Sequence, residues 1–220
     1  MGPMNALNDG MAKQVAVTRS VLFGLLLVPF FANDVLFHFM TTPAAIYGVD
    51  YVIRVVVIGA FVLSPPPRSL AVESLRWRSK YLWGVVLAVV VAVVIWAESP
   101  TVDYVFQRWT GWWRYAGYPA LDMGALKVFD LTVGLLLVAV SEELVCRALA
   151  CDVFRRLTTN RALVAMLSSL LFGLVHWGGG LGGVASGAVA GLLLTGLYFA
   201  SGSLVPAIAA HYAVDLILFW

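Results

Sequence analysis

The chain has 220 residues, of which 61% are hydrophobic and only 12% are charged, with a formal net charge of +2. Soluble domains are usually about 45–50% apolar and about 25% charged. This composition excludes an ordinary soluble domain and predicts an integral membrane protein in contact with the lipid bilayer. The small net charge gives no reason to expect a nucleic-acid partner.

The first 19 residues are polar compared with the rest of the chain, and we expect them to form a loose N-terminal tail. The apolar run after Arg19 is as long as a full membrane span, which is longer than the short core of a signal peptide. The domain prediction is therefore a tail over 1–19 followed by a single integral membrane domain over 20–220.

Seven segments approach the length of about 20 apolar residues that a membrane helix requires. They lie at roughly 20–40, 45–63, 81–98, 126–154, 162–177, 183–201 and 204–220. The alternation that is typical of outer-membrane barrels is not visible in them. The predicted fold is all-α: a polytopic transmembrane helical bundle with about seven membrane helices.

Three segments outside these spans hold most of the basic residues. They are the tail, with Lys13 and Arg19, and the two linkers at 64–80 and 154–161. With seven spans, all three fall on the same side of the membrane, which the positive-inside rule makes cytoplasmic. We therefore expect a protein of the bacterial or archaeal cytoplasmic membrane; the sequence does not indicate its oligomeric state.

Residues 103–119 are dense in tryptophan and tyrosine, and Arg108 and Arg114 interrupt them. Aromatic residues of this kind gather at the level of the lipid headgroups. We therefore expect an interfacial aromatic segment that anchors the protein, with a substrate gate as the alternative.

The sixth predicted span carries Gly183, Gly187 and Gly191 at intervals of four residues. Small residues at this spacing form a stripe along one face of a helix and allow another helix to approach closely. We expect the stripe to pack inside the bundle; dimerisation through it is the alternative.

Charged residues interrupt the long fourth segment at 141–149, which reads SEELVCRAL. Glu143 and Arg147 are four residues apart with the acid first, the favoured order for an ion pair on a helix. Glu142 points about 100° away from Glu143 and has no local partner. Since ionisable groups inside a membrane are costly and usually functional, Glu142 is a candidate site residue.

Two of the three histidines lie in the apolar segments that follow. His176 is near the end of the fifth span, and His211 is in the last span, four residues before Asp215 on the same helix face. A lone buried histidine is usually structural. A glutamate and two histidines that converge in a dry cavity, however, can activate a water directly or through a metal. Hydrolysis and transport both remain open from these residues alone.

Three patterns now occur in order in apolar segments: Glu142-Glu143-x-x-x-Arg147, Phe172-x-x-x-His176 and His211-x-x-x-Asp215. They resemble the signature motifs of the CAAX protease and bacteriocin-processing family, also called Abi-type intramembrane endopeptidases. The resemblance implies an intramembrane endopeptidase with its catalytic helices in 126–220.

The resemblance also implies roles for the motif residues. Glu142 and His176 would activate a water that attacks a peptide bond of a membrane-anchored protein or peptide. His211 and Asp215 would stabilise the oxyanion or position the water. We favour a glutamic mechanism without a cofactor, since no HExxH pair is present; zinc held by Glu142, His176 and His211 is the alternative. Four further residues would support the site: Glu143, Cys146, Arg147 and Phe172.

The last motif departs from the family pattern, because it often ends in asparagine where this chain has Asp215. The family also covers enzymes that process or sort the C-termini of secreted proteins, and this is one subtype that the chain could represent. Two alternatives stay open: a cysteine protease that uses Cys146 or Cys151, and a polytopic transporter or immunity-type binding protein with a buried Glu/His site.

Overall fold

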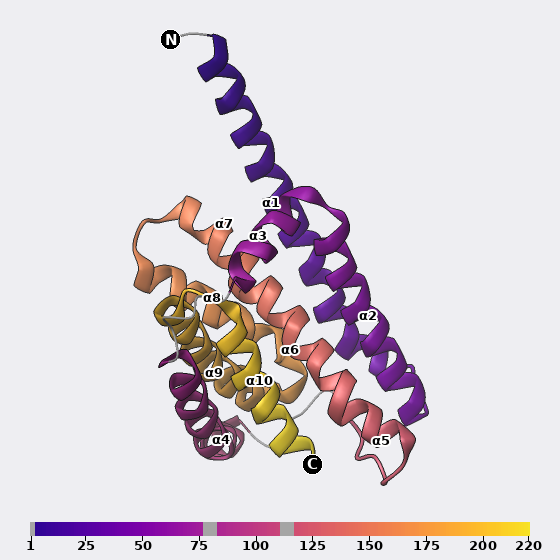
Figure 1. The fold of residues 1–220 in the computed structure, drawn as a ribbon. Helices are drawn as coiled ribbons and strands as arrows, with labels where there is room; N and C mark the ends of the chain where they lie inside the picture. Colours follow the sequence, from indigo (N-terminus) through magenta and orange to yellow (C-terminus); the bar gives the residue numbers. More distant parts are fainter. Residues whose placement is uncertain (1–2, 77–82, 111–116) are drawn as a thin grey trace.

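The computed structural model describes residues 3–76, 83–110 and 117–220, and every regular element in these ranges is helical (Figure 1). The all-α prediction is therefore confirmed for the described part of the chain. The elements are α1 (Pro3–Phe37), α2 (Pro43–Leu63), α3 (Pro65–Leu75), α4 (Trp83–Thr110), α5 (Ala125–Phe129), η2 (Asp130–Gly134), α6 (Leu135–Glu143), η3 (Leu144–Leu149), α7 (Ala150–Leu157), α8 (Arg161–Val175), η4 (Trp177–Gly179), α9 (Gly180–Ser201) and α10 (Leu204–Phe219).

The centre of the bundle is a continuous helical rod made of α5, η2, α6, η3 and α7. Figure 1 shows this rod running diagonally, with α1 and α2 on one side and α8, α9 and α10 on the other. α6 packs against α2 and α10, and α4 covers α9 and α10 from outside. Two stretches of the rod, η2 and η3, are π-helical. Such stretches are rare and frequently lie at functional sites.

Within the described ranges, four helices are long and apolar enough to cross a membrane: Asp9–Phe37, Pro43–Leu63, Trp83–Phe106 and Trp177–Ser201. Each of the seven predicted segments contains a helix, but α8 and α10 are shorter apolar helices of 15 and 16 residues. The charged residues of the central rod interrupt its apolar surface. The all-helical architecture is thus confirmed, and the number of about seven membrane spans is not.

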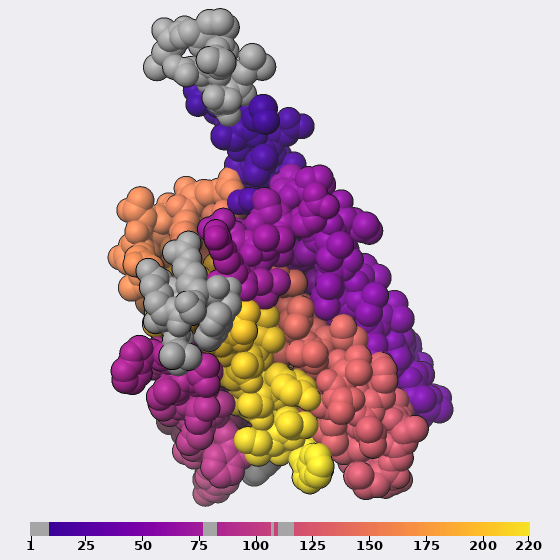
Figure 2. Space-filling model, viewed as in Figure 1, coloured from indigo at the N-terminus to yellow at the C-terminus, as the bar shows by residue number. Residues whose placement is uncertain are grey.

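The predicted loose tail is wrong for the residues that the structure describes. α1 runs without a break from Pro3 to Phe37, and its residues 9–14 are exposed where the helix projects beyond the packed helices (Figures 1 and 2). Pro3 stands at the start of the helix, where its fixed φ is favourable, and good helix formers such as Ala12, Lys13 and Gln14 follow it. The polar composition of the tail therefore indicated exposure and not a lack of structure.

The aromatic segment at 103–119 is divided between different structures. α4 continues through it as far as Thr110 and leaves Trp109 exposed. Residues 111–116, which include the predicted aromatic residues Trp112, Trp113 and Tyr115, lie outside the described ranges. Tyr118 lines an internal cavity. The interfacial position of the segment stays a prediction.

The three segments that hold most of the basic residues meet at one end of the bundle. Arg19 of α1 forms an ion pair of 3.1 Å with Asp152 of α7, and its Nε donates to the carbonyl oxygen of Pro66 in α3 at 3.1 Å. Asp152 also pairs with Arg156 at 2.5 Å. The segments thus contact one another, and their position on the cytoplasmic side of the membrane stays a prediction.

The glycine stripe packs α9 against α8, as predicted for the interior of the bundle. A Cβ at Gly187 would lie 3.2 Å from the Cα of Gly173, and one at Gly191 would lie 3.0 Å from the Cα of Ser169. The two backbones are close enough that side chains would separate them. This contact fixes the end of α8, where His176 lies, against the start of α9.

We expect Gly173→Ala to destabilise the protein by about 1–3 kcal/mol, because overpacking forces the backbone to move. Its Cβ would overlap the carbonyl oxygen of Val184 and would lie 2.9 Å from the Cβ of Ala188. Gly196→Ala is the matched control, since no atom lies within 4 Å of its Cβ. Thermal unfolding in detergent compares the two variants; equal stability would contradict the close approach of α8 and α9.

Candidate active site

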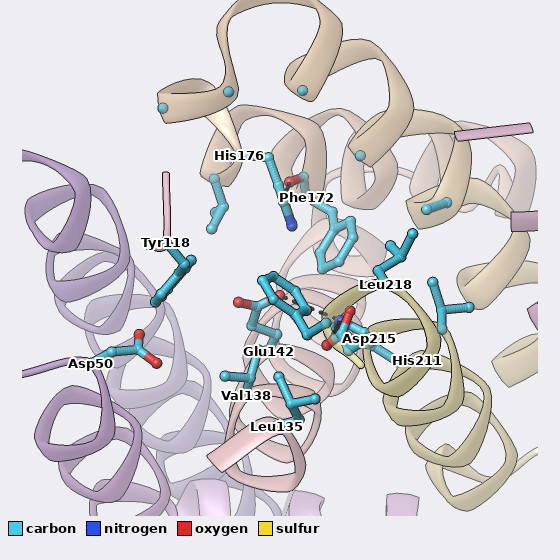
Figure 3. A pocket seen from close by; sticks show the side chains of 18 of the residues that line it. Asp50, Tyr118, Leu135, Val138, Glu142, Phe172, His176, His211, Asp215 and Leu218 are labelled. Atoms are coloured by element: carbon cyan, nitrogen blue, oxygen red, sulfur yellow. Dashed lines mark hydrogen bonds and ion pairs between the residues drawn. The ribbon is translucent and has the colours of Figure 1, made fainter. Parts of the chain in front are cut away.

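A cavity of about 330 Å³ lies between the N-terminal helices α1 and α2, the central rod, and helices α8 to α10. All four residues predicted to be catalytic line it: Glu142, His176, His211 and Asp215. Figure 3 shows Glu142 and His211 on one side of the Phe172 ring and His176 on the other. The structure therefore brings together side chains from three motifs that are far apart in the sequence.

Glu142 lies in the last turn of α6 and is only 3% exposed. Its Oε1 accepts a hydrogen bond of 2.7 Å from Nη1 of Arg54. Its Oε2 has no hydrogen-bond partner among the described residues and lies 3.8 Å from Nε2 of His211. Glu142 has no local partner, as predicted, but the expectation that it is unpaired is wrong, because its partner comes from α2.

The sequence analysis missed Arg54, which holds a buried network together on the N-terminal side of the cavity. Its Nε pairs with Asp50 at 3.0 Å, and its guanidinium lies 4.7 Å from the ring centroid of Phe30. Nδ2 of Asn33 donates to Asp50 at 2.8 Å and to the hydroxyl of Tyr118 at 3.2 Å. A signal was present: Asp50 and Arg54 are ionisable residues four apart in an apolar span.

His211 projects from α10 and is held by two carboxylates. Its Nδ1 lies 3.0 Å from Oε1 of Glu143, and its Nε2 lies 3.4 Å from Oδ2 of Asp215. An ionised carboxylate only accepts hydrogen bonds, so we assign a proton to Nδ1 of His211. The predicted shared face of His211 and Asp215 is confirmed. The hydrogen bond that orients the ring, however, goes to Glu143.

His176 ends α8, where the chain turns into η4. Its Nδ1 bonds to the carbonyl oxygen of Phe172 at 2.7 Å, and a carbonyl oxygen only accepts, so this nitrogen also carries a proton. The Phe172 ring lies 4.6 Å from the His176 ring and 5.5 Å from the His211 ring. Phe172 therefore separates and orients both imidazoles, which agrees with its predicted supporting position.

Glu143 and Arg147 form the predicted ion pair, with 3.0 Å between Oε1 and Nη1. Both side chains are fully buried, and the Arg147 guanidinium lies 3.8 Å from the centroid of the Phe172 ring. The pair thus supports the residues around both histidines. Cys146 is also fully buried, and neither it nor Cys151 is among the described residues that line the cavity. This placement weighs against the cysteine-protease alternative.

The zinc alternative has little support in the arrangement of these side chains. In the part of the chain that the structure describes, no group of three or more His, Cys, Asp or Glu side chains could hold a metal ion. Arg54 pairs with one oxygen of Glu142, and its positive charge opposes a cation at this carboxylate. Glu142, His176 and His211 share a cavity without forming a ligand set, so we derive no step through a metal.

A buried glutamate beside an imidazole, in a cavity enclosed by apolar helices, is the arrangement expected of an intramembrane hydrolase. Residues 124–217 match the family model described as Type II CAAX prenyl endopeptidase Rce1-like. This match confirms the resemblance to the CAAX protease family and includes all three motifs. It implies an intramembrane protease, and the four long apolar helices agree with an integral membrane protein. No curated protein and no solved structure matches the chain.

Proposed function

We propose that the protein is an intramembrane endopeptidase in which Glu142 activates a water to hydrolyse a peptide bond of a membrane-associated substrate. The observation that carries this proposal is the gap between Oε2 of Glu142, which lacks a hydrogen-bond partner among the described residues, and Nε2 of His211, 3.8 Å away. A water about 2.8 Å from each of these two atoms would bridge them. Such a water would lie at the wall of the cavity, where a substrate carbonyl can reach it.

The chemistry follows from the orientation of these groups. Oε2 of Glu142 accepts a proton from the water while the water oxygen attacks the carbonyl carbon of the scissile bond. Negative charge develops on the carbonyl oxygen, and an N–H of His211, protonated on Nε2, stabilises it. Protonated Glu142 then donates to the leaving amine nitrogen as the C–N bond breaks. The products are a carboxylic acid and an amine, and Glu142 is again a carboxylate.

Three other residues position these groups in this proposal. Arg54 binds Oε1 of Glu142 and so leaves Oε2 to face the water. Oδ2 of Asp215 lies 3.4 Å from Nε2 of His211 and helps to orient the imidazole ring. Nδ1 of His176 donates its proton to the carbonyl oxygen of Phe172, so a neutral His176 keeps a lone pair on Nε2 that can accept a proton from a group in the cavity.

We favour the glutamic mechanism over a metal-dependent one because Arg54 already neutralises Glu142 and occupies one of its oxygens. Metal analysis of the active protein and incubation with a chelator test this preference. We expect cleavage to continue after the chelator has removed any bound metal. Loss of cleavage with the chelator, and its recovery on addition of zinc alone, would establish the metal-dependent alternative.

The position of the cavity in the bundle suggests the side from which substrate enters. On α1, the cavity residues Phe30 to Phe37 follow Arg19 by 11–18 residues, which corresponds to about 16–27 Å of helix. The cavity thus lies away from the end where the basic segments meet. The positive-inside rule makes that basic end cytoplasmic. We therefore place the cavity toward the outer half of a bacterial or archaeal cytoplasmic membrane, where C-terminal processing or sorting of exported proteins would occur.

This orientation predicts opposite labelling of two single-cysteine additions. Asp122 precedes α5, at the cavity end, and Thr159 lies in the turn between α7 and α8, at the basic end; both are exposed. In spheroplasts, we expect a membrane-impermeant maleimide to label Asp122→Cys, and to label Thr159→Cys only after permeabilisation. The parent chain, whose Cys146 and Cys151 are buried, is the blank. The reverse pattern would overturn the orientation.

Cleavage by the purified chain in liposomes tests the proposed function. A set of peptides that carry a membrane anchor is incubated with the protein in water enriched in ¹⁸O, and the products are analysed by mass spectrometry. We expect a shortened peptide with one ¹⁸O atom in its new carboxylate. Proton-coupled uptake into the liposomes without any cleavage would instead select the transporter alternative.

A further inference from the structure

The N-terminal helices bring charged and polar groups into the cavity that the proposed hydrolysis does not use. Asn33 and Asp34 are neighbours on α1, and both line the cavity. Oδ2 of Asp34 accepts a hydrogen bond of 3.0 Å from the backbone N–H of Gly178, two residues after His176. Asp34 therefore lies close to the reacting groups, although it belongs to none of the three motifs.

The cavity is strongly acidic. Its described lining holds a single guanidinium, Arg54, and five carboxylates: Asp34, Asp50, Asp130, Glu142 and Asp215. Arg54 lies within ion-pair distance of Asp50 and Glu142, and Asp34 has no ion-pair partner among the residues described. With the carboxylates ionised, protonation of both lining histidines would still leave an excess of negative charge. A group that enters this part of the cavity is stabilised if it is positive.

One buried oxygen in the same place lacks a donor. Asn33 is 2% exposed, and its Nδ2 already donates to Asp50 and to Tyr118. Its Oδ1 is buried with no hydrogen-bond partner in the described ranges. A buried acceptor without a partner is destabilising, so natural proteins seldom leave one. Asn33 lines the cavity, so a bound N–H donor, together with a small movement of the neighbouring side chains, would satisfy this oxygen.

Aromatic side chains form the neighbouring wall. The rings of Phe37 and Tyr118 are 5.0 Å apart and nearly perpendicular, and those of Tyr47 and Tyr118 are 5.3 Å apart. All three residues line the cavity. Aromatic faces attract cations and also pack against the methylene groups of long basic side chains.

We propose that Asn33, Asp34 and the aromatic wall form a subsite for a cationic side chain, lysine or arginine, of the substrate close to its cleaved bond. This proposal rests on the proposed peptidase function, because the cation belongs to the peptide that is cleaved. Asp34 balances the charge, Oδ1 of Asn33 accepts an N–H, and the rings hold the aliphatic stem. The same subsite disfavours a carboxylate, including the C-terminal carboxylate of a substrate.

The test uses membrane-anchored peptides that are identical except for one residue, lysine or norleucine, placed in turn at each position near the cleaved bond. We expect the parent to prefer lysine at one position by about tenfold or more in kcat/KM, as is usual for a hydrogen bond to a charged group. Asp34→Asn keeps an acceptor for Gly178 and removes the charge, so its preference should fall below about threefold. Asp122→Asn, an exposed position outside the cavity, should retain it.

Equal use of lysine and norleucine at every position by the parent, or a preference that survives in Asp34→Asn, would overturn the subsite while the peptidase function stands. If the parent cleaves no peptide, the peptidase function fails, and binding of a small probe decides about the subsite. Butylammonium should then raise the unfolding temperature of the parent and not that of Asp34→Asn, with butanol as the neutral control. No difference between the two probes would remove the subsite.

Discussion

Glu142→Gln should lower kcat/KM for peptide cleavage by about 10²–10⁴-fold, the usual contribution of a general base. The amide keeps nearly the shape of the carboxylate, and its oxygen can still accept from Arg54. It cannot take a proton from the water at the position of Oε2. Arg54 also keeps its ion pair with Asp50 at 3.0 Å, so the variant should fold and be nearly as stable as the parent.

Cleavage rates and thermal unfolding in detergent, measured on the same preparations, check this expectation. Glu73→Gln makes the same chemical change at an exposed position on α3 and serves as the control for both measurements. A Glu142→Gln variant that cleaves peptides at the parental rate would remove Glu142 from the reaction.

The sequence predicted those parts of the candidate site in which two residues lie on the same face of one helix. Glu143 with Arg147, and His211 with Asp215, are four apart, so each pair shares a helix face whatever the rest of the fold does. Their order along the chain then indicated a resemblance to the family, and the match over residues 124–217 confirms this resemblance.

The other half of the cavity could not be predicted in this way, because its contacts join distant parts of the chain. Arg54 and Glu142 are 88 residues apart in sequence, and Asp34 and Gly178 are 144 apart. No local spacing indicates which helices will be neighbours. Asp50 and Arg54 are charges in an apolar span that were not singled out from the sequence, and the fold shows that Arg54 pairs with Glu142.

The number of membrane spans was difficult to predict for a different reason. Hydropathy measures length and apolarity, and both are reduced where a helix carries a buried site. α8 ends at His176, and the central rod holds Glu142, Glu143 and Arg147. The sequence therefore shows seven apolar segments, and the fold shows which of them form a single helix long enough to cross a membrane.

Glu143 and Arg147 differ from Glu142 in how much stability depends on them. Both are fully buried, and Glu143 is the single carboxylate within ion-pair distance of Arg147 among the described residues. Glu142, in contrast, shares Arg54 with Asp50. Removal of the Glu142 charge thus leaves Arg54 paired with Asp50. Removal of the Glu143 charge, in contrast, leaves Arg147 as a buried charge with no counter-ion among the described residues.

Glu143→Gln should therefore destabilise the protein by about 3–5 kcal/mol, the cost of breaking a buried ion pair by removing one partner. The double variant Glu143→Gln/Arg147→Met should recover most of this loss, because it removes the unpaired charge and keeps an unbranched apolar side chain against Phe172. Unfolding in detergent, followed for Glu142→Gln, Glu143→Gln and the double variant, measures the difference. Equal stability of the two glutamine variants would contradict the assignment of a structural role to Glu143 and a catalytic role to Glu142. A double variant as unstable as Glu143→Gln would show that the loss of stability does not come from the unpaired charge of Arg147.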